Sequence, residues 1–304
     1  MELLLDEIGL ARAALIAGPT ASGKSALALR LAEELEHRGR RAWIVNADAM
    51  QVYDGLRLLS ARPAARDEER VPHRLYGHVS PAVRYSVGAW LSDIGPVLAE
   101  ALAAGALAIV VGGTGLYFKA LTEGLSAIPD IPPEVRARWF ARLQTEGVAA
   151  LHALLAKRDP ASGAVVRPSD PQRVLRALEV FEVTGLPLEE RQSMPQSPLL
   201  TKTESALIVI DVDRPTLHRR IEERFDRMVG EGALEEVRGL VTLGLDPNLP
   251  AMRAIGVREF SAVLCGDISL AAAIAKAKTQ TRRYGKRQDT WFRHQMPDWP
   301  RLRA

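Results

Sequence analysis

The segment GPTASGKS at residues 18–25 limits the folds open to this chain more than any other part of its sequence. It follows the apolar run Ala13–Ala17 and precedes a run of good helix formers. A G-x-x-x-x-G-K-[ST] segment between a strand and a helix is typical of a loop whose backbone N–H groups bind phosphate oxygens. In such a loop, Lys24 reaches the outer phosphate and Ser25 offers a hydroxyl group to Mg²⁺. The segment therefore predicts an α/β fold of the P-loop type.

Four apolar runs predict a parallel sheet with helices on both faces, because strands that are buried on both faces are apolar along their whole length. They lie at 13–17, 43–45, 106–111 and 206–211. The spacing predicts helices at 25–38 and 86–104 between these strands, and at 215–243 and 269–289 after them. The long gap before the fourth strand indicates that an insertion interrupts the sheet.

The insertion, at residues 121–200, is rich in Arg, and prolines divide it into helices. In its segment DPQRVLRALEVFEVTG, Asp170 is a good N-cap and Pro171 suits the first helical position. The helix is expected to bury Val174, Leu178 and Phe181 and to carry Gln172, Arg173 and Arg176 on its other side. We therefore expect a P-loop core at 1–120 and 201–304 and a helical insertion domain at 121–200.

The composition indicates a cytoplasmic protein. A single cysteine, Cys265, excludes an internal disulfide and suits a reducing compartment. It lies among small and apolar residues, so we expect a buried, unreactive thiol. The longest weakly polar run, 101–113, is too short to cross a bilayer, and we expect no association with a membrane. The net charge of +3 permits a polyanionic partner.

The strand at 106–111 lacks the Asp that normally follows the second buried strand of an ATP-using P-loop enzyme and helps to hold Mg²⁺. Glycines and Thr114 follow it instead, and they allow another group to approach the carboxyl edge of the sheet, where ligands bind in such folds. Asp48 follows a different strand, at 43–45. There a carboxylate can serve the reacting substrate. It can equally be the N-cap of a short helix at 49–53.

Two basic stretches have the composition of a nucleic-acid surface, which combines cations for phosphates with aromatic side chains for bases. The segment KAKTQTRRYGKRQDTWFRH at 276–294 contains one acid, Asp289, and three aromatic residues. In the helix expected at 215–243, a stripe of arginines adjoins the apolar face. The stripe consists of Arg220, Arg224 and Arg227, and one of these side chains can reach over the P-loop. The alternatives are an ordinary solvated helix face, and neutralisation of these arginines by Glu222, Glu223 and Asp226.

Six sequence blocks resemble the tRNA dimethylallyltransferases in the same order, and the resemblance covers nearly the whole chain. The blocks are GPTASGKS, NADAMQVY, VPHRLYGHV, VGGTGLYFKAL, DPQRVLRALEVFEVTG and TRRYGKRQDTWFR. The resemblance implies transfer of a dimethylallyl group from dimethylallyl diphosphate to N6 of adenosine 37, next to the tRNA anticodon, with release of diphosphate. ATP is then not consumed, which accounts for the missing Asp. The implied partner is the tRNA anticodon stem-loop, the implied cofactor is Mg²⁺, and we expect a monomer.

The resemblance also implies roles for individual residues. Asp48 is the implied general base for N6, Thr114 contacts the reacting centre, and Arg224 contacts the diphosphate. The diphosphate loop comprises Gly18, Thr20, Ala21, Ser22, Gly23, Lys24 and Ser25, with Ser25 also at the metal. The residues implied to contact tRNA are Asp48, Ala49, Met50, Gln51, Gln172, Arg173, Arg176, Arg282, Lys286 and Arg287.

The chain departs from the family pattern at four positions, none of which removes a group that the implied mechanism needs. Ala49 stands where the family usually has Ser, Ser60 and Arg62 replace a Thr and a Lys, and Gly285 replaces an Ala.

Three alternative functions fit part of the sequence. A prenyltransferase acting on free AMP needs no large insertion, and a kinase leaves the basic segments without a role. An RNA-binding protein with a vestigial loop does not explain the intact Lys24, Ser25 and Asp48.

Overall fold

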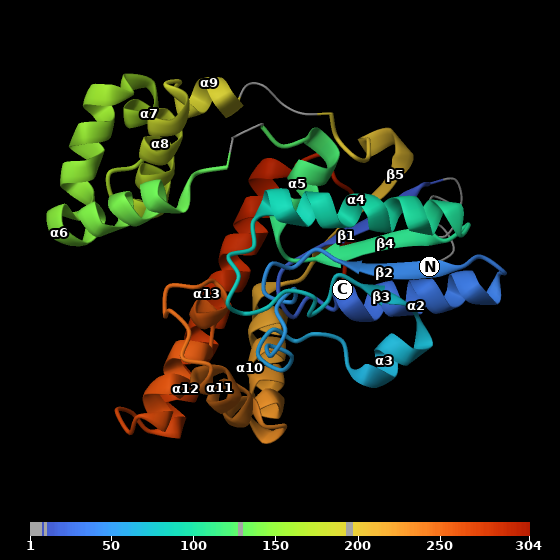
Figure 1. Ribbon diagram of the computed structural model, residues 1–304. Helices are drawn as coiled ribbons and strands as arrows, with labels where there is room; N and C mark the ends of the chain where they lie inside the picture. The colour runs from blue at the N-terminus through green and yellow to red at the C-terminus, as the bar shows by residue number, and fades with distance from the viewer. Residues whose placement is uncertain (1–7, 9–10, 127–129, 193–196) are drawn as a thin grey trace. The chain divides into compact units, whose positions relative to one another are not determined.

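The computed structural model describes residues 8, 11–126, 130–192 and 197–304 (Figure 1). The chain divides into two compact units. The first unit combines Met1–Thr122 with Leu199–Ala304, and the second is Glu123–Pro198. In the described part of the chain, no helix combines the length and the apolar character that crossing a bilayer requires.

The first unit is built on a six-stranded parallel sheet, as the apolar runs predict. The strand order is β3-β2-β4-β1-β5-β6, so the P-loop strand β1 lies in the interior of the sheet. The strands are β1 (Ala13–Ala17), β2 (Ala42–Asn46), β3 (His73–Arg74), β4 (Leu107–Gly112), β5 (Ser205–Asp211) and β6 (Arg301–Arg303). Ala17 pairs with Gly112 on one side and with Val209 on the other. The carboxyl ends of β1, β4 and β5 therefore meet at one edge.

Helices cover both faces of the sheet, and side chains that alternate along β1 enter two different cores. Ala14 and Ile16 pack on the face covered by α2 (Lys24–His37), together with Leu31. Ala13, Leu15 and Ala17 pack on the opposite face, against α4 (Val87–Ala103) and α5 (Gly115–Glu123). The short helix α3 (Ala65–Arg70) lies between β2 and β3 in the chain (Figure 1). The layered α/β fold that the P-loop predicts is confirmed.

Four helices form a third apolar cluster in the first unit, together with residues 52–56 after β2. They are α10 (Arg214–Gly230), α11 (Ala233–Thr242), α12 (Val257–Leu264) and α13 (Leu270–Gln295). The single helix predicted at 215–243 is wrong: the chain breaks at Gly232, which adopts φ 105°, a conformation that favours glycine. The buried thiol predicted for Cys265 is also wrong, because this residue is exposed where α12 ends.

The second unit packs its helices around Trp139, Leu151 and Val174. The helices are α6 (Pro133–Arg158), which is interrupted at Gly147, α7 (Pro160–Val165), α8 (Pro171–Thr184) and α9 (Leu188–Gln192). Helix α8 has the predicted limits, because the Asp170 carboxylate accepts a hydrogen bond from the Arg173 N–H (3.1 Å) and Gly185 ends the helix in the left-handed conformation. Phe181 is only half-buried, unlike the fully buried Val174 and Leu178.

Gly285 lies in the interior of α13, where an alanine side chain fits. A Cβ atom there would lie 3.5 Å from Leu217, 3.6 Å from Thr20 and 3.7 Å from Ile221, which are ordinary van der Waals distances. Because glycine weakens a helix interior relative to alanine, Gly285→Ala should raise the free energy of unfolding by about 0.5–1 kcal/mol. Urea unfolding measures this change. Gly23→Ala, at φ 91°, should lower stability, and a loss of stability in Gly285→Ala would contradict the packing described for α13.

Candidate active site

The loop between β1 and α2 has the conformation of a phosphate cradle. Ala21 and Gly23 adopt positive φ values of 61° and 91°, and α2 begins at Lys24 directly after Gly23. Ser22 is fully buried, and its hydroxyl has no hydrogen-bond partner among the described residues. A buried polar group without a partner is rare in folded proteins, so this hydroxyl is available to an anion seated in the loop.

Lys24 is buried within the loop, and its Nζ donates a hydrogen bond to the Pro19 carbonyl (3.4 Å). Burial lowers the pKa of Lys24 to about 8, a shift that the Asp48 carboxylate opposes and the Arg224 guanidinium reinforces. A buried ammonium without a carboxylate ion pair is costly, and an anion in the loop would offset this cost.

Two arginines of α10 reach the loop. The Arg224 guanidinium donates a hydrogen bond to the Thr20 hydroxyl, and the Arg220 guanidinium donates one to the Ser22 carbonyl (3.3 Å). Burial lowers the pKa of Arg224 to about 10, against the opposing effect of Asp48. The acids of α10 do not neutralise these arginines, because they pair with other cations: Glu222 with Arg282, Glu223 with Arg219, and Asp226 with Lys278. The neutralised alternative considered for this stripe is therefore wrong for Arg220 and Arg224.

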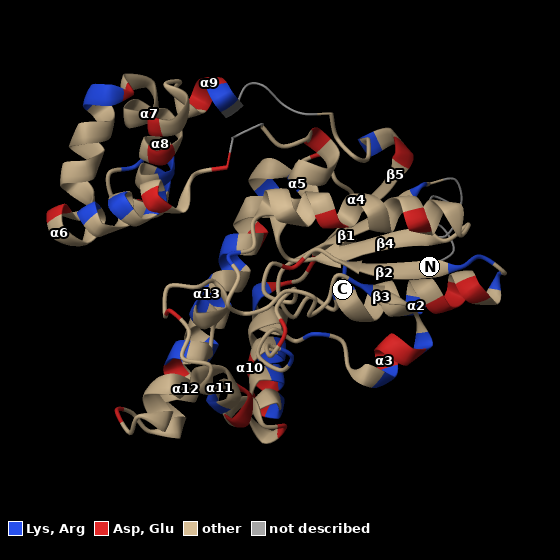
Figure 2. Ribbon diagram, in the orientation of Figure 1, with Lys and Arg blue, Asp and Glu red and all other residues tan. Residues whose placement is uncertain are grey.

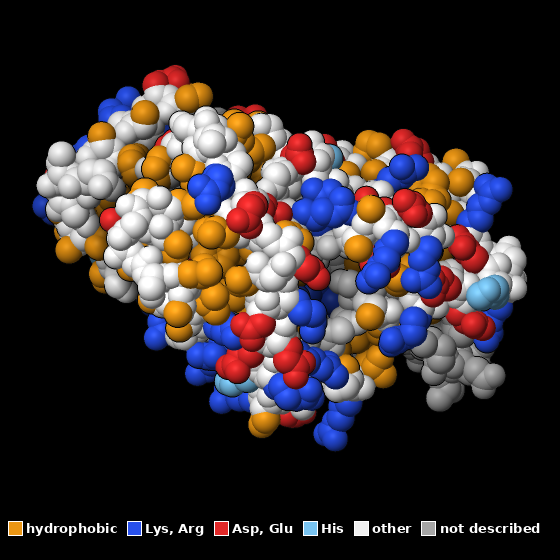
Figure 3. All heavy atoms as spheres, turned by 90° about the horizontal axis from the view of Figure 1, so that it is seen from below, with side chains coloured by type: hydrophobic (Ala, Val, Ile, Leu, Met, Phe, Trp, Pro, Cys, Tyr) orange, Lys and Arg blue, Asp and Glu red, His pale blue; other side chains and the backbone are white. Residues whose placement is uncertain are grey.

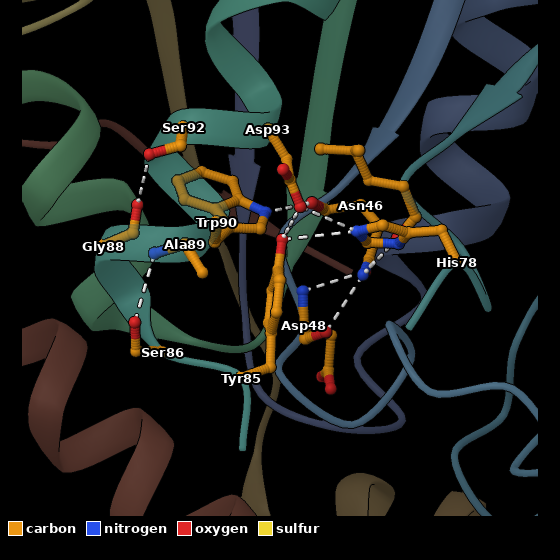
Figure 4. Close-up of polar contacts among 11 residues, drawn as sticks. Asn46, Asp48, His78, Tyr85, Ser86, Gly88, Ala89, Trp90, Ser92 and Asp93 are labelled. Carbon is orange, nitrogen blue, oxygen red and sulfur yellow. Dashed lines mark hydrogen bonds and ion pairs between the residues drawn. The ribbon is translucent and has the colours of Figure 1, made fainter. Parts of the chain in front are cut away.

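Asp48 is held by its main chain, which leaves one side of its carboxylate open. The Asn46 side chain accepts a hydrogen bond from the Asp48 N–H (2.8 Å) and donates one to the Asp48 carbonyl (3.0 Å). Trp90 Nε1 in turn donates to the Asn46 carbonyl (2.9 Å). Figure 4 shows the Asp48 carboxylate pointing away from this network. Its Oδ1 accepts the Met50 N–H (2.9 Å), and Oδ2 has no hydrogen-bond partner in the described part of the chain.

The short helix considered at 49–53 does not form. Residues 49–52 adopt turns, and Asp48 caps the first of them through the Met50 N–H. Aspartate commonly stabilises such turns in this way. Asp48 therefore has a structural hydrogen bond at Oδ1 and a free acceptor at Oδ2.

Thr114 lies beside Asp48 at the end of β4. Its Oγ1 accepts the Ala49 N–H (2.9 Å), and its own N–H donates to the Ala47 carbonyl (3.1 Å). This close approach requires glycine before it, because a Cβ atom on Gly112 would lie 2.0 Å from the Ala47 carbonyl oxygen. The Thr114 hydroxyl hydrogen is left free to donate to a substrate.

A cavity of about 270 Å³ is lined by Asp48, by Arg224 and by Thr20 of the loop. Its polar lining comprises Thr20, Asp48, Ser60, Arg224, Arg253, Thr281, Tyr284 and Arg287, and its apolar lining includes Leu59, Ile221, Phe225, Met228 and Ile255. Burial and the Asp48 charge raise the pKa of Tyr284, so its phenol stays protonated and can donate a hydrogen bond. A cavity with a cationic end, a carboxylate and an apolar wall suits a substrate that is partly anionic and partly apolar.

A second cavity, of about 640 Å³, lies against Pro19 of the loop and is strongly basic. Its cationic lining comprises Arg214, Arg282, Arg283, Lys286, Arg293 and Arg303, and its acids are Asp211, Asp213 and Asp289. Figure 2 shows Lys and Arg on both α10 and α13, and Figure 3 shows basic side chains gathered near apolar ones on one face.

The residues that the family resemblance predicts to contact tRNA differ in their surroundings: some line a cavity, one is buried, and others lie on the second unit. Ala49, Met50 and Arg287 line the smaller cavity, and Arg282 and Lys286 line the larger one. Gln51 is buried, and its side-chain amide donates to the carbonyls of Ser60 (2.9 Å) and Ala61 (3.0 Å), so in this conformation it supports a loop. On α8, in the second unit, Gln172 and Arg173 are exposed, and Arg176 is half-buried beside Glu179 (3.7 Å).

Gln288 of α13 is a residue of the candidate site that the sequence did not predict. This side chain is buried between the P-loop and the end of β4, where it accepts a hydrogen bond from Thr20 and donates one to Gly113. A signal was present, because Gln288 continues the buried stripe of Thr281, Gly285 and Phe292 at helical spacing. A polar residue on a buried helix face needs partners, which is a reason to suspect a specific contact.

The sheet, the loop and the two cavities define a P-loop α/β protein whose carboxyl edge is equipped for an anionic substrate. The sequence model of the family "IPP transferase" matches residues 51–295, a segment that begins after the P-loop and Asp48. The chain belongs to this family of IPP transferases.

Curated relatives named tRNA dimethylallyltransferase match nearly the whole chain. The relative from Chelativorans sp. (strain BNC1) is 56% identical over 292 residues, which cover 95% of this chain and 98% of the relative. The relative from Mesorhizobium japonicum is 51% identical, with 96% of this chain and 89% of the relative covered.

Two solved structures also match. The full-length tRNA isopentenylpyrophosphate transferase of Bacillus halodurans aligns with a TM-score of 0.65 and 32% identity, covering 95% of this chain and 89% of that one. A eukaryotic dimethylallyltransferase captured acting on tRNA aligns with a TM-score of 0.77 and 25% identity, covering 96% and 73%.

Proposed function

We propose that this protein transfers a dimethylallyl group from dimethylallyl diphosphate to N6 of adenosine 37 in tRNA and releases diphosphate. One observation carries the proposal: the Asp48 carboxylate and the Arg224 guanidinium line the same cavity, and Arg224 also donates a hydrogen bond to Thr20 of the loop that contains the buried Lys24. The names of the relatives support the reaction type and the tRNA substrate. A tRNA substrate is also the reason for proposing a cytoplasmic location, and we propose a monomer.

At the donor end, the carbon–oxygen bond of the allylic diphosphate breaks, with positive charge on carbon and negative charge on the leaving group. Lys24, Arg224 and the N–H groups of the loop would stabilise that negative charge, which is the larger part of catalysis in such a site. The Ser22 hydroxyl would supply one further hydrogen bond to the anion.

The residues present fit a Mg²⁺ ion held mainly by the diphosphate. Ser25 offers a hydroxyl at the start of α2, and no group of three or more His, Cys, Asp or Glu side chains suited to a metal was found among the described residues. Mg²⁺ is commonly bound by one or two protein groups together with substrate phosphates and water. When bound, the ion would offset the charge of the leaving diphosphate.

At the acceptor end, N6 of adenine would form the new bond to carbon as the bond to diphosphate breaks. Asp48 Oδ2 would accept the N6 proton, and the Thr114 hydroxyl would help to orient the base. The adenine must leave its stack to reach these groups, as in other enzymes that modify bases. The apolar wall of the smaller cavity offers a surface for the ring or the prenyl group.

The tRNA would be held through its phosphates by basic side chains of both units. We propose that the insertion domain contributes Gln172, Arg173 and Arg176, and that α13 contributes Arg282, Lys286 and Arg287. Arg173 is exposed, and its only ion pair among the described residues is a long one to Asp170 (3.6 Å). It is therefore available to a phosphate.

We predict that tRNA affinity falls steeply with salt and that Arg173→Glu weakens it further. Each lost phosphate contact should reduce the slope of log affinity against log salt by about 1, because fewer counterions are released. Filter binding across a salt series measures both effects. Arg38→Glu, an exposed arginine at the far end of α2, serves as the control and should bind normally. An affinity that does not depend on salt would contradict recognition through these faces.

Labelled dimethylallyl diphosphate, offered in parallel with unmodified tRNA and with AMP, tests the proposed substrates. We expect label in tRNA alone. Label in AMP but not in tRNA would establish the free-nucleotide alternative, and phosphoryl transfer from ATP would establish the kinase alternative.

A further inference from the structure

The side chain of Gln288 joins two segments that are remote from it in the sequence. It is 6% exposed. Its Oε1 accepts a hydrogen bond from the Thr20 N–H (2.8 Å), and its Nε2 donates one to the Gly113 carbonyl (2.8 Å). Both ends of one amide are therefore used, and both bonds have good length.

The two partners of Gln288 belong to opposite ends of the proposed reaction. Thr20 lies in the P-loop. Its N–H donates to Gln288 and its hydroxyl accepts a hydrogen bond from the Arg224 guanidinium, so two side chains hold this residue. Gly113 directly precedes Thr114, whose Oγ1 accepts the Ala49 N–H next to Asp48. A single amide thus connects the donor loop with residues 113–114, and Thr114 in turn contacts the segment that carries the open carboxylate.

The packing around Gly113 leaves room for this amide and little else. A Cβ atom on Gly113 would lie 2.3 Å from Gln288 Nε2 and 3.3 Å from Asp48 Oδ2. A Cβ atom on Gly115 would lie 2.1 Å from the Trp291 ring. Helix α13 therefore rests directly on the backbone of residues 113–115, and glycine at these positions permits the contact.

We propose that Gln288 is a positioning residue that fixes the distance between the donor loop and Asp48. This inference rests on the proposed function. Transfer requires the allylic carbon and N6 to be held within about 3–3.5 Å, and a displacement of about 1 Å can cost 10²-fold in rate. Without the amide, the Thr20 N–H and the Gly113 carbonyl lose their shared partner, and the two segments can shift relative to each other.

Single-turnover transfer from labelled dimethylallyl diphosphate to tRNA tests this role. Gln288→Met keeps the length of the side chain and removes the hydrogen bonds to Thr20 and Gly113, together with the interaction of the amide with the Tyr284 phenol. We expect its rate constant to fall about 10²-fold. The amplitude of the first turnover, measured separately with both substrates in excess over the enzyme, and the tRNA affinity should stay within twofold of the wild type. A merely structural role would instead lower the amplitude, because the amplitude reports the fraction of active enzyme. It would leave the rate constant unchanged.

Two further variants complete the test. Gln295→Met, on the same helix, removes an exposed hydrogen bond from Lys119 and should behave like the wild type. Gly113→Ala keeps Gln288 but displaces its amide, so it should slow transfer as well. This variant replaces Gln288→Met in the test if Gln288→Met is too unstable to assay. Combined with Gln288→Met, it should cost less than the sum of the two single losses, because both changes break the Gln288–Gly113 contact, and the part that remains additive reports crowding of Asp48 Oδ2 by the new Cβ atom.

A rate constant within threefold of the wild type in a folded Gln288→Met or Gly113→Ala variant would overturn the inference alone. Absence of transfer by the wild type and by Gln295→Met would contradict the proposed function, and the inference with it.

Discussion

Replacing Asp48 with Asn should lower the single-turnover rate of transfer by about 10²–10⁴-fold, with both substrates still bound. The lone pair on adenine N6 is delocalised into the ring, so N6 becomes a good nucleophile only as its proton is withdrawn. The open Oδ2 of Asp48 is the acceptor available for that proton. Asn can still accept the Met50 N–H through its carbonyl oxygen, so the turn at 48–50 should survive.

The structural role of Asp48 predicts a different result for the same variant. Asn stabilises turns and caps about as well as Asp, so a purely structural carboxylate would tolerate the change in both rate and stability. Asp54→Asn is the matched control, because Asp54 is exposed and its carboxylate also accepts a backbone N–H, that of Gly55 (2.8 Å). Transfer at the wild-type rate by Asp48→Asn would remove Asp48 from the mechanism.

Replacing Lys24 with Ala should lower the rate of donor use by about 10²–10³-fold and leave tRNA affinity within twofold of the wild type. The Lys24 ammonium lies inside the loop, where the proposed leaving diphosphate would bind. Rapid-quench transfer and filter binding measure the two quantities. Lys119→Ala, which removes a half-buried lysine of α5 that bonds Gln295, is the control. Near-normal transfer by Lys24→Ala would mean that the P-loop is not the donor site.

The pH dependence of donor use supplies a second test of Lys24. Burial lowers its pKa to about 8, and only the protonated ammonium attracts diphosphate. The charge is therefore complete well below pH 8 and is lost as the pH rises through that value. We expect kcat/KM for the donor to decline above about pH 8 in the wild type. This decline should be absent in Lys24→Ala, and the same profile in both would assign it to another group.

Local chemistry made much of the fold predictable. Asp170, Pro171 and Gly185 mark the ends of α8 through short-range hydrogen bonds and backbone preferences, so its limits could be predicted to the residue. The break at Gly232 was missed because apolar residues continue at helical spacing on both sides of it. Periodicity reports which face is buried, and a single left-handed glycine can end a helix without changing that pattern.

The geometry of the candidate site was predictable where the contacts of a residue lie within its own segment, and it was not where partners lie far apart in the sequence. The phosphate cradle is contained within residues 18–25, so its motif was sufficient. Gln288 meets Thr20 across 268 positions, a pairing that no local pattern encodes. For Gln51, the family block identifies the residue, but the block does not reveal that the side-chain amide donates to the Ser60 carbonyl in a neighbouring loop.

Digestion of reacted tRNA, followed by mass spectrometry of the oligonucleotides, tests the central claim most directly. The wild-type protein, incubated with unmodified tRNA, dimethylallyl diphosphate and Mg²⁺ but without ATP, should add one dimethylallyl group to adenosine 37 for each diphosphate released. Asp48→Asn should add almost none in the same time. Modification at another nucleotide, or transfer that requires ATP, would contradict the account.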